Sequence, residues 1–127
     1  MKPASRVLVV DDNALNIELV VFVLSDDGFT VASATDAADA QRQIPVFRPD
    51  LILMDIQMPG VDDLELTRRL KANPATRHIF IVAFTAYAMK GDEAKLLAGG
   101  CDGYLSKPID VASFAATLRN FITGQNA

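Results

Sequence analysis

Residues 51–55 read Leu51-Ile52-Leu53-Met54-Asp55, a run of large apolar residues that ends in a carboxylate. Its length and residue types are typical of a strand buried on both faces of a parallel sheet. Three more apolar runs each lead directly into polar residues: 7–10 into Asp11-Asp12, 79–84 into Thr85, and 103–106 into Lys107. In an open parallel sheet, ligands bind outside the carboxyl ends of the strands. We therefore expect three aspartates, a hydroxyl and an ammonium group to converge at one edge of a sheet.

Helical patterns alternate with these strands along the whole chain. Four strands are predicted after the first one, at 29–34, 50–54, 79–84 and about 103–106. Helices are predicted at about 13–27, 36–44, 63–72, 90–98 and 111–123. We expect Asn13 and Asp110 to cap two of these helices, Gly28 to end the first helix and Pro45 to end the second. Strands joined by single helices imply an α/β protein with a parallel sheet covered on both faces.

The size and charge of the chain limit the classes of protein to which it can belong. Its 127 residues and net charge of −4 fit one globular domain over residues 1–127, with a core from about 6 to 122 and no output domain. No apolar stretch reaches the roughly 20 residues of a membrane span, and the first six residues lack a signal peptide. The basic cluster around Arg68-Arg69 is typical of a solvated helix face, so we expect neither a nucleic-acid nor a membrane partner.

The only cysteine and the only histidine exclude two kinds of structure. Cys101 has no second cysteine to pair with, and His78 is the single histidine, so neither an internal disulfide nor a zinc site is expected. We interpret Cys101 as a small apolar core residue. A reduced cysteine and the lack of a targeting segment indicate a cytoplasmic protein.

The polar residues that we expect at this edge of the sheet are suited to phosphoryl transfer. Asp11 and Asp12 are hard oxygen ligands for Mg²⁺ or a similar divalent ion, although the pair alone fits equally well a helix cap and a solvated loop. Asp55 at a strand end can act as a nucleophile towards phosphorus. Lys107 and Thr85 would then supply a positive charge and a hydroxyl donor for the phosphoryl oxygens, and a metal ion would neutralise the remaining charge.

Four motifs at this edge resemble the receiver domain of two-component response regulators. They are Val9 to Asn13, Leu53 to Gly60, Thr85-Ala86, and Tyr104 to Pro108. The resemblance covers about residues 6–122, and residues 84–93 further resemble stand-alone cell-cycle regulators and the receivers of hybrid sensor kinases. It implies a flavodoxin-like (βα)5 fold, a doubly wound parallel sheet of five strands in the order 2-1-3-4-5.

The same resemblance implies a role for each residue of the edge. Asp55 would be the phosphoacceptor, and Asp11, Asp12, Asp55 and the backbone carbonyl of Gln57 would hold Mg²⁺ or Mn²⁺. The phosphoryl donor would be a histidine kinase or a histidine phosphotransfer protein. The protein would act as a signalling switch and catalyse no reaction beyond its own phosphorylation and dephosphorylation.

The resemblance also implies how the protein changes conformation when it is phosphorylated. Thr85 and Lys107 would bind the phosphoryl group, Thr85 would move towards it, and Tyr104 would fill the space left behind. This change would alter the surface offered to a downstream protein target. Phe84 stands where the family usually has an aliphatic residue, and we expect it to crowd the sheet next to Thr85.

One inference comes from the first predicted helix itself, which is apolar on two sides. We expect the sheet to be contacted by Ile17, Val20, Val21 and Leu24. Leu15, Leu19 and Phe22 would then lie on the opposite side, where an exposed apolar stripe typically marks a partner surface. We expect this stripe to dock a helix of the phosphodonor; a cover of neighbouring loops or a homodimer contact are the alternatives.

Three other functions compete with the signalling switch. A haloacid-dehalogenase-like phosphatase would need a second aspartate at position 57, where this chain has Gln57. A flavin- or nucleotide-binding domain would need a phosphate loop after the first strand, where Asp11-Asp12 would repel phosphate. A degenerate receiver that serves only as an adaptor would not need the full set of Asp55, Thr85 and Lys107.

Overall fold

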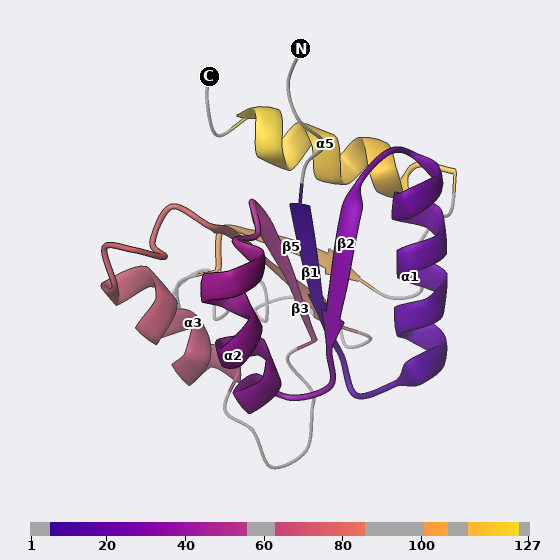
Figure 1. The fold of residues 1–127 in the computed structure, drawn as a ribbon. Coiled ribbons are helices and arrows are strands. Elements are labelled where there is room, and N and C mark those ends of the chain that lie inside the picture. Colours follow the sequence, from indigo (N-terminus) through magenta and orange to yellow (C-terminus); the bar gives the residue numbers. More distant parts are fainter. Residues whose placement is uncertain (1–5, 56–62, 86–100, 107–111, 125–127) are drawn as a thin grey trace.

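Five parallel strands form the centre of the protein (Figure 1). The computed structural model describes residues 6–55, 63–85, 101–106 and 112–124. The strands are β1 (Arg6–Val10), β2 (Thr30–Ala34), β3 (Leu51–Asp55), β4 (Phe80–Thr85) and β5 (Gly103–Ser106). Their order in the sheet is β2-β1-β3-β4-β5, which confirms the predicted order 2-1-3-4-5. The helices that accompany them are α1 (Ala14–Asp26), α2 (Ala37–Phe47), α3 (Asp63–Ala72) and α5 (Phe114–Gly124).

The sheet is covered by helices on both faces because successive strand residues point to opposite sides. One core cluster joins strand residues such as Ile52 and Met54 to Ile44 of α2 and Leu70 of α3. The other cluster contains the alternate strand positions and the buried residues of α1 and α5. Residues 51–54 are fully buried, which explains why β3 is apolar at every position rather than at every second one.

Helix α1 begins and ends at the residues that the sequence predicted. The Asn13 side chain accepts hydrogen bonds from the backbone N–H groups of Leu15 and Asn16. At the other end Gly28 adopts a φ of 94°, and the Phe29 N–H donates to the Leu24 carbonyl, which closes the helix in the way that a glycine stop allows.

The predicted inner face of α1 needs one correction. Val20 and Leu24 are buried and Ile17 packs against the same cluster, but Val23 is buried where Val21 was predicted. Val21 is only partly buried and lies outside that cluster. The inner face is therefore centred between Val20 and Leu24 and is rotated slightly from the predicted one.

The prediction that Pro45 ends the second helix is wrong, since α2 continues through Pro45 to Phe47. A proline lacks the N–H that would bond to the carbonyl of Gln41, which is an exposed residue of the helix. The extra turn lets Phe47 pack against the core. The helix ends only at Arg48, whose φ is 54° and whose N–H donates to the Ile44 carbonyl.

The last predicted helix begins later than expected, because α5 starts at Phe114 and residues 112–113 form a turn. The predicted helix at 90–98 and the predicted cap at Asp110 lie outside the described residues. On the inward face of α5, Phe114 and Leu118 are buried and Phe121 packs against the same cluster. Within the residues that the structure describes, no helix is long and apolar enough to cross a membrane.

Candidate functional site

The strand register brings several predicted site residues to one edge of the sheet. Val10 of β1 is paired with Met54 of β3, so the next residues, Asp11 and Asp55, follow at the same level on adjacent strands. Adjacent strands lie about 4.8 Å apart, which is close enough for two such carboxylates to share a ligand. Asp55 is paired with Phe84, and Thr85 therefore lies one step further along β4. Thr85 is paired in turn with Ser106, the last residue of β5.

Asp11 is a buried carboxylate that is held in a fixed orientation. It is 1% exposed, and its Oδ1 accepts a hydrogen bond from the Asn13 N–H at 2.8 Å. The Asn16 side-chain amide approaches the second oxygen at 3.5 Å. Asp12, the next residue, is exposed. The edge thus has one buried, oriented acidic group and one group in contact with solvent.

The start of α1 supports this acidic turn. Asn13 caps the helix with its side chain and donates its own N–H to Asp11, so the same residue fixes both the helix and the carboxylate. The amino-terminal end of a helix carries a partial positive charge, which favours anions placed close to it. Asn16 was not among the predicted site residues. Its position five residues after Asp11, in the first turn of the helix, was the signal that could have identified it.

Other predicted site residues are placed only in part. Gln57 and Lys107 lie outside the described residues. Asp55 and Thr85 occupy the last positions of β3 and β4, and Tyr104 lies within β5, paired with Ala83. Among the side chains that the structure describes, no group of three or more His, Cys, Asp or Glu residues is arranged to hold a metal ion. The structure therefore places the strand ends of the predicted site and the geometry of Asp11, and no more.

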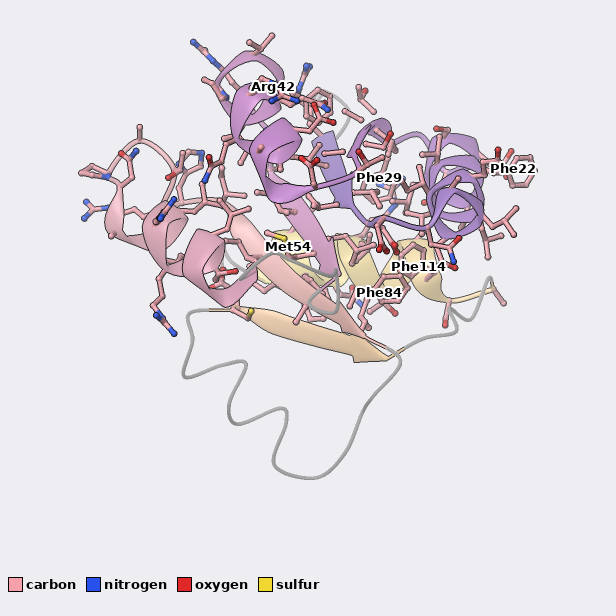
Figure 2. The ribbon with its side chains drawn as sticks, turned by 90° about the horizontal axis from the view of Figure 1, so that it is seen from below. Phe22, Phe29, Arg42, Met54, Phe84 and Phe114 are labelled. Carbon is pink, nitrogen blue, oxygen red and sulfur yellow. The ribbon has the colours of Figure 1, made fainter. Side chains whose placement is uncertain are left out.

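Phe84 packs between the sheet and α5. Its side chain is buried and stacks on Phe114 of α5, with the ring centroids 6.1 Å apart and the planes inclined by 30° (Figure 2). The aromatic pair is therefore accommodated between the sheet and α5. It connects the strand position next to Thr85 with the first turn of that helix.

The apolar residues on the outer side of α1 are exposed. Leu15 is 75% exposed, Leu19 43% and Phe22 71%. Figure 2 shows Phe22 pointing away from the rest of the protein, whereas Phe84 and Phe114 lie in its interior. These three residues form the α1 stripe. The described part of the chain does not cover this stripe, which begins just two residues after Asn13 at the acidic edge.

The sequence profile of the response regulator receiver domain matches residues 7–119. The chain belongs to this family. It is 42% identical to the polar-differentiation response regulator DivK of Brucella anthropi over 116 residues, which is 91% of this chain and 94% of the relative. The protein is accordingly a phosphoacceptor switch of a two-component system, a signalling protein rather than a member of a classical enzyme family.

Solved structures of receivers have the same fold. The chemotaxis response regulator CheY4 of Vibrio cholerae superimposes with a TM-score of 0.85 at 25% identity, over 93% of this chain and 98% of that one. The receiver domain of a signal transduction histidine kinase from Syntrophus aciditrophicus gives a TM-score of 0.84 at 28% identity, over 95% and 92%. Family and fold together set aside the phosphatase and the flavin-binding alternatives.

Proposed function

We propose that Asp55 is the residue that receives the phosphoryl group. Its position carries this proposal: it ends β3 one step past Met54, on the strand adjacent to the one that leads into the buried Asp11. A carboxylate oxygen of Asp55 would attack the phosphorus of a phosphohistidine. The P–N bond would break, the electron pair would stay on the donor imidazole, which takes up a proton, and an acyl phosphate would form on Asp55.

The acidic edge has the donor chemistry for a divalent cation. Receiver domains generally bind Mg²⁺ at an acidic pocket, and the residues of this chain that would hold Mg²⁺ or Mn²⁺ are Asp11, Asp12, Asp55 and the carbonyl of Gln57. The buried, oriented carboxylate of Asp11 supports this assignment, because a second and a third carboxylate beside it would repel one another without a counter-ion. When bound, the metal ion would supply the positive charge that lets an anionic nucleophile approach an anionic phosphoryl group.

Thr85 and Lys107 would bind the phosphoryl oxygens through a hydroxyl hydrogen bond and an ammonium charge. The position of Thr85 at the end of β4, one step past the partner of Asp55, supports its part in this. In this proposal the protein promotes its own phosphorylation and also its dephosphorylation, in which water attacks phosphorus and the Asp55 carboxylate leaves. Thr85 and Tyr104 would then form the switch that signals to a downstream protein target.

We further propose that the α1 stripe docks the phosphodonor, a histidine kinase dimerisation domain or a histidine phosphotransfer protein. Three exposed apolar side chains, Leu15, Leu19 and Phe22, lie at i, i+4 and i+7 on one side of a helix that begins at the acidic edge. A donor helix packed there would lie beside Asp55. The cytoplasm is the proposed location, since a chain whose single cysteine, Cys101, permits no internal disulfide agrees with a reducing compartment.

Intact mass after incubation with Mg²⁺ and acetyl phosphate tests the acceptor. We expect the wild-type protein to gain one phosphoryl group and Asp55→Asn to gain none. Asp50→Asn is the matched control: it lies just before β3 at the opposite end of the same strand, and the asparagine can still accept the hydrogen bond from the Arg6 N–H. An adduct that persists in Asp55→Asn, or that is lost in Asp50→Asn, would contradict the assignment.

Transfer from a protein donor tests the α1 stripe separately. Leu15→Asp and Phe22→Asp should slow transfer from the cognate phosphodonor roughly tenfold or more, because a charge would be buried in the interface. Labelling by acetyl phosphate should stay unchanged, since a small donor needs no docking surface. Val46→Asp, an equally conspicuous apolar residue on α2 that is 82% exposed, is the control and should transfer normally. Unchanged transfer in both stripe variants would reject docking while leaving Asp55 as acceptor.

A further inference from the structure

A cavity of about 750 Å³ lies at the edge of the sheet opposite to Asp55, where α2 and α3 end. Its floor is apolar and belongs to the core cluster on that face of the sheet. The floor residues, each at most 7% exposed, are Ile44, Leu66, Leu70 and Ile79. Cavities of roughly 300 to 1,000 Å³ with apolar walls and a few polar groups are typical of small-molecule sites.

The charged groups around this cavity are all cationic or basic. Arg48, Arg69 and His78 line it, and none of the lining residues that the structure describes carries a carboxylate. This is unexpected for a chain whose net charge is −4. The Arg48 guanidinium and the His78 imidazole form no ion pair with a described carboxylate. The rim therefore offers positive charge above an apolar floor.

Arg48 also has an unfavourable backbone conformation. With a φ of 54° it is the one non-glycine residue of the described chain in the left-handed region. Helices commonly end on a residue in this conformation, usually a glycine, and an arginine there costs free energy that glycine would not. The arginine that ends α2 therefore also brings a cationic side chain to the lining of the cavity.

Arginines at helix ends have a simpler role, which is to offset the partial negative charge of the last carbonyls. That charge amounts to about half an elementary charge per helix end. Arg48 carries a full positive charge, so the rim beside it stays positive after the end of α2 is offset. Two of these carbonyls already accept hydrogen bonds: Ile44 accepts from the Arg48 N–H, and Leu70 accepts from the Thr76 hydroxyl.

We propose that this cavity binds a small amphipathic anion. Its apolar body, an aromatic or branched hydrocarbon group, would contact Ile44, Leu66, Leu70 and Ile79, and its carboxylate, sulfonate or phosphate group would contact Arg48 and His78. The site is spatially separate from Asp55, because it lies at the other end of the strands and shares no residue with the acidic edge.

Fluorescence titration with 1-anilinonaphthalene-8-sulfonate, an aromatic anion, tests the site. We expect saturable binding of one molecule per chain, and much weaker binding of N-phenyl-1-naphthylamine, which has the same apolar body without the sulfonate. Amide chemical-shift changes should be confined to the ends of α2 and α3 and to residues 73–79. Equal binding of the two probes, or no saturable binding, would overturn the proposal.

Variants separate this site from other apolar surfaces. The double variant Arg48→Asn, His78→Gln should bind the sulfonate probe roughly fivefold to tenfold more weakly, since asparagine tolerates the left-handed backbone and removes only the charge. Arg77→Gln, next in sequence to His78 but outside the lining, should bind as the wild type does. Ala75→Trp should block binding by filling the exposed rim. The opposite pattern, in which Phe22→Asp abolishes binding and the double variant does not, would assign the probe to the α1 stripe and overturn the cavity site.

Discussion

The Arg119 guanidinium of α5 donates a hydrogen bond to the Asp27 carboxylate at the end of α1, with 2.7 Å between Nε and Oδ2. The same guanidinium also donates to the Asp27 backbone carbonyl. Its carbon lies 4.6 Å from the centroid of the Phe29 ring. One side chain thus joins the two helices that cover this face of the sheet.

We expect Arg119→Met to lower the free energy of unfolding by about 1 kcal/mol. The ion pair is about half exposed and is worth only a few tenths of a kcal/mol, so most of the loss comes from the stacking on Phe29 and the bond to the carbonyl. Asp27→Asn should cost less, because it leaves those two contacts in place. Urea unfolding of both single variants and of the double variant gives the coupling between the two residues.

Arg42→Met on α2 is the control for this measurement. Its partner Asp39 lies one turn away on the same helix, and the arginine side chain is 71% exposed, so we expect a loss of about 0.3 kcal/mol or less. A loss at Arg119 no larger than the loss at Arg42 would show that the contact between α1 and α5 contributes nothing specific.

Asp102 lies just before β5 and binds the backbone near the start of β4. Its Oδ2 accepts a hydrogen bond from the Ile81 N–H at 2.9 Å and pairs with the ammonium group of Lys71. Lys71 also donates to the Ile79 carbonyl at 2.7 Å, so the end of α3 is connected to the same point.

Asp102→Ala should therefore destabilise the protein by about 2 kcal/mol, because the N–H of the fully buried Ile81 loses its acceptor. Asp102→Asn retains an acceptor and removes the charge, so it should cost clearly less. Thermal unfolding of the two variants checks this order. Equal losses would mean that the ion pair with Lys71, rather than the hydrogen bond, carries the effect.

The buried strands could be predicted from the sequence because each is a short, largely apolar run. Their order in the sheet was instead implied by the resemblance to receiver domains. The polar residue at each strand end is equally visible, since chain order alone puts it at the carboxyl edge. The orientation of Asp11 was not predictable. It depends on hydrogen bonds from Asn13 and Asn16, and the sequence indicated only a helix cap at Asn13 and an ordinary helix residue at Asn16.

The sequence rules for helix ends gave a wrong prediction where tertiary contacts had the larger effect. Pro45 reads as a helix end, yet Phe47 gains enough by packing on the core to extend α2 by a further turn. The left-handed conformation of Arg48 follows from that extension and from no property of arginine. The cavity between α2 and α3 could not be predicted from the sequence either, because two stretches that are distant in sequence, 41–49 and 66–79, form it together.

Gly103 is required by an aromatic contact across the sheet edge. The rings of Phe80 and Phe121 stack with their centroids 5.3 Å apart, and a Cβ at position 103 would lie 3.2 Å from a carbon of each ring. Gly103→Ala should therefore cost about 1 to 3 kcal/mol through overpacking. Gly103→Ala should cost less when it is introduced into the Phe121→Leu variant than when it is introduced into the wild type, because the smaller side chain leaves room for the added methyl group. Urea unfolding measures both, and additive losses would show that the ring contact is not the cause.

The Cys101 thiol gives the stability a specific dependence on alkaline pH. Burial raises the pKa of this thiol above its ordinary value of 9.0, and Asp102 acts in the same direction, while a hydrogen bond with Thr67 and the charge of Lys71 oppose them. The unfolded chain therefore loses the thiol proton at a lower pH than the folded chain does. The folded state binds more protons in that window, so the stability that the neutral thiol contributes is complete below about pH 9 and is lost as the pH rises towards the folded pKa.

Cys101→Ala removes this titration and isolates it from the lysines and tyrosines that both proteins share. Urea unfolding under reducing conditions should give a constant difference between wild type and variant from about pH 7 to pH 8. The wild type should then lose stability relative to the variant by at most about 1.4 kcal/mol per pH unit above about pH 9, since one proton is involved. A difference that stays constant up to about pH 10 would mean that the folded thiol ionises like the unfolded one, contrary to its burial at 4% exposure.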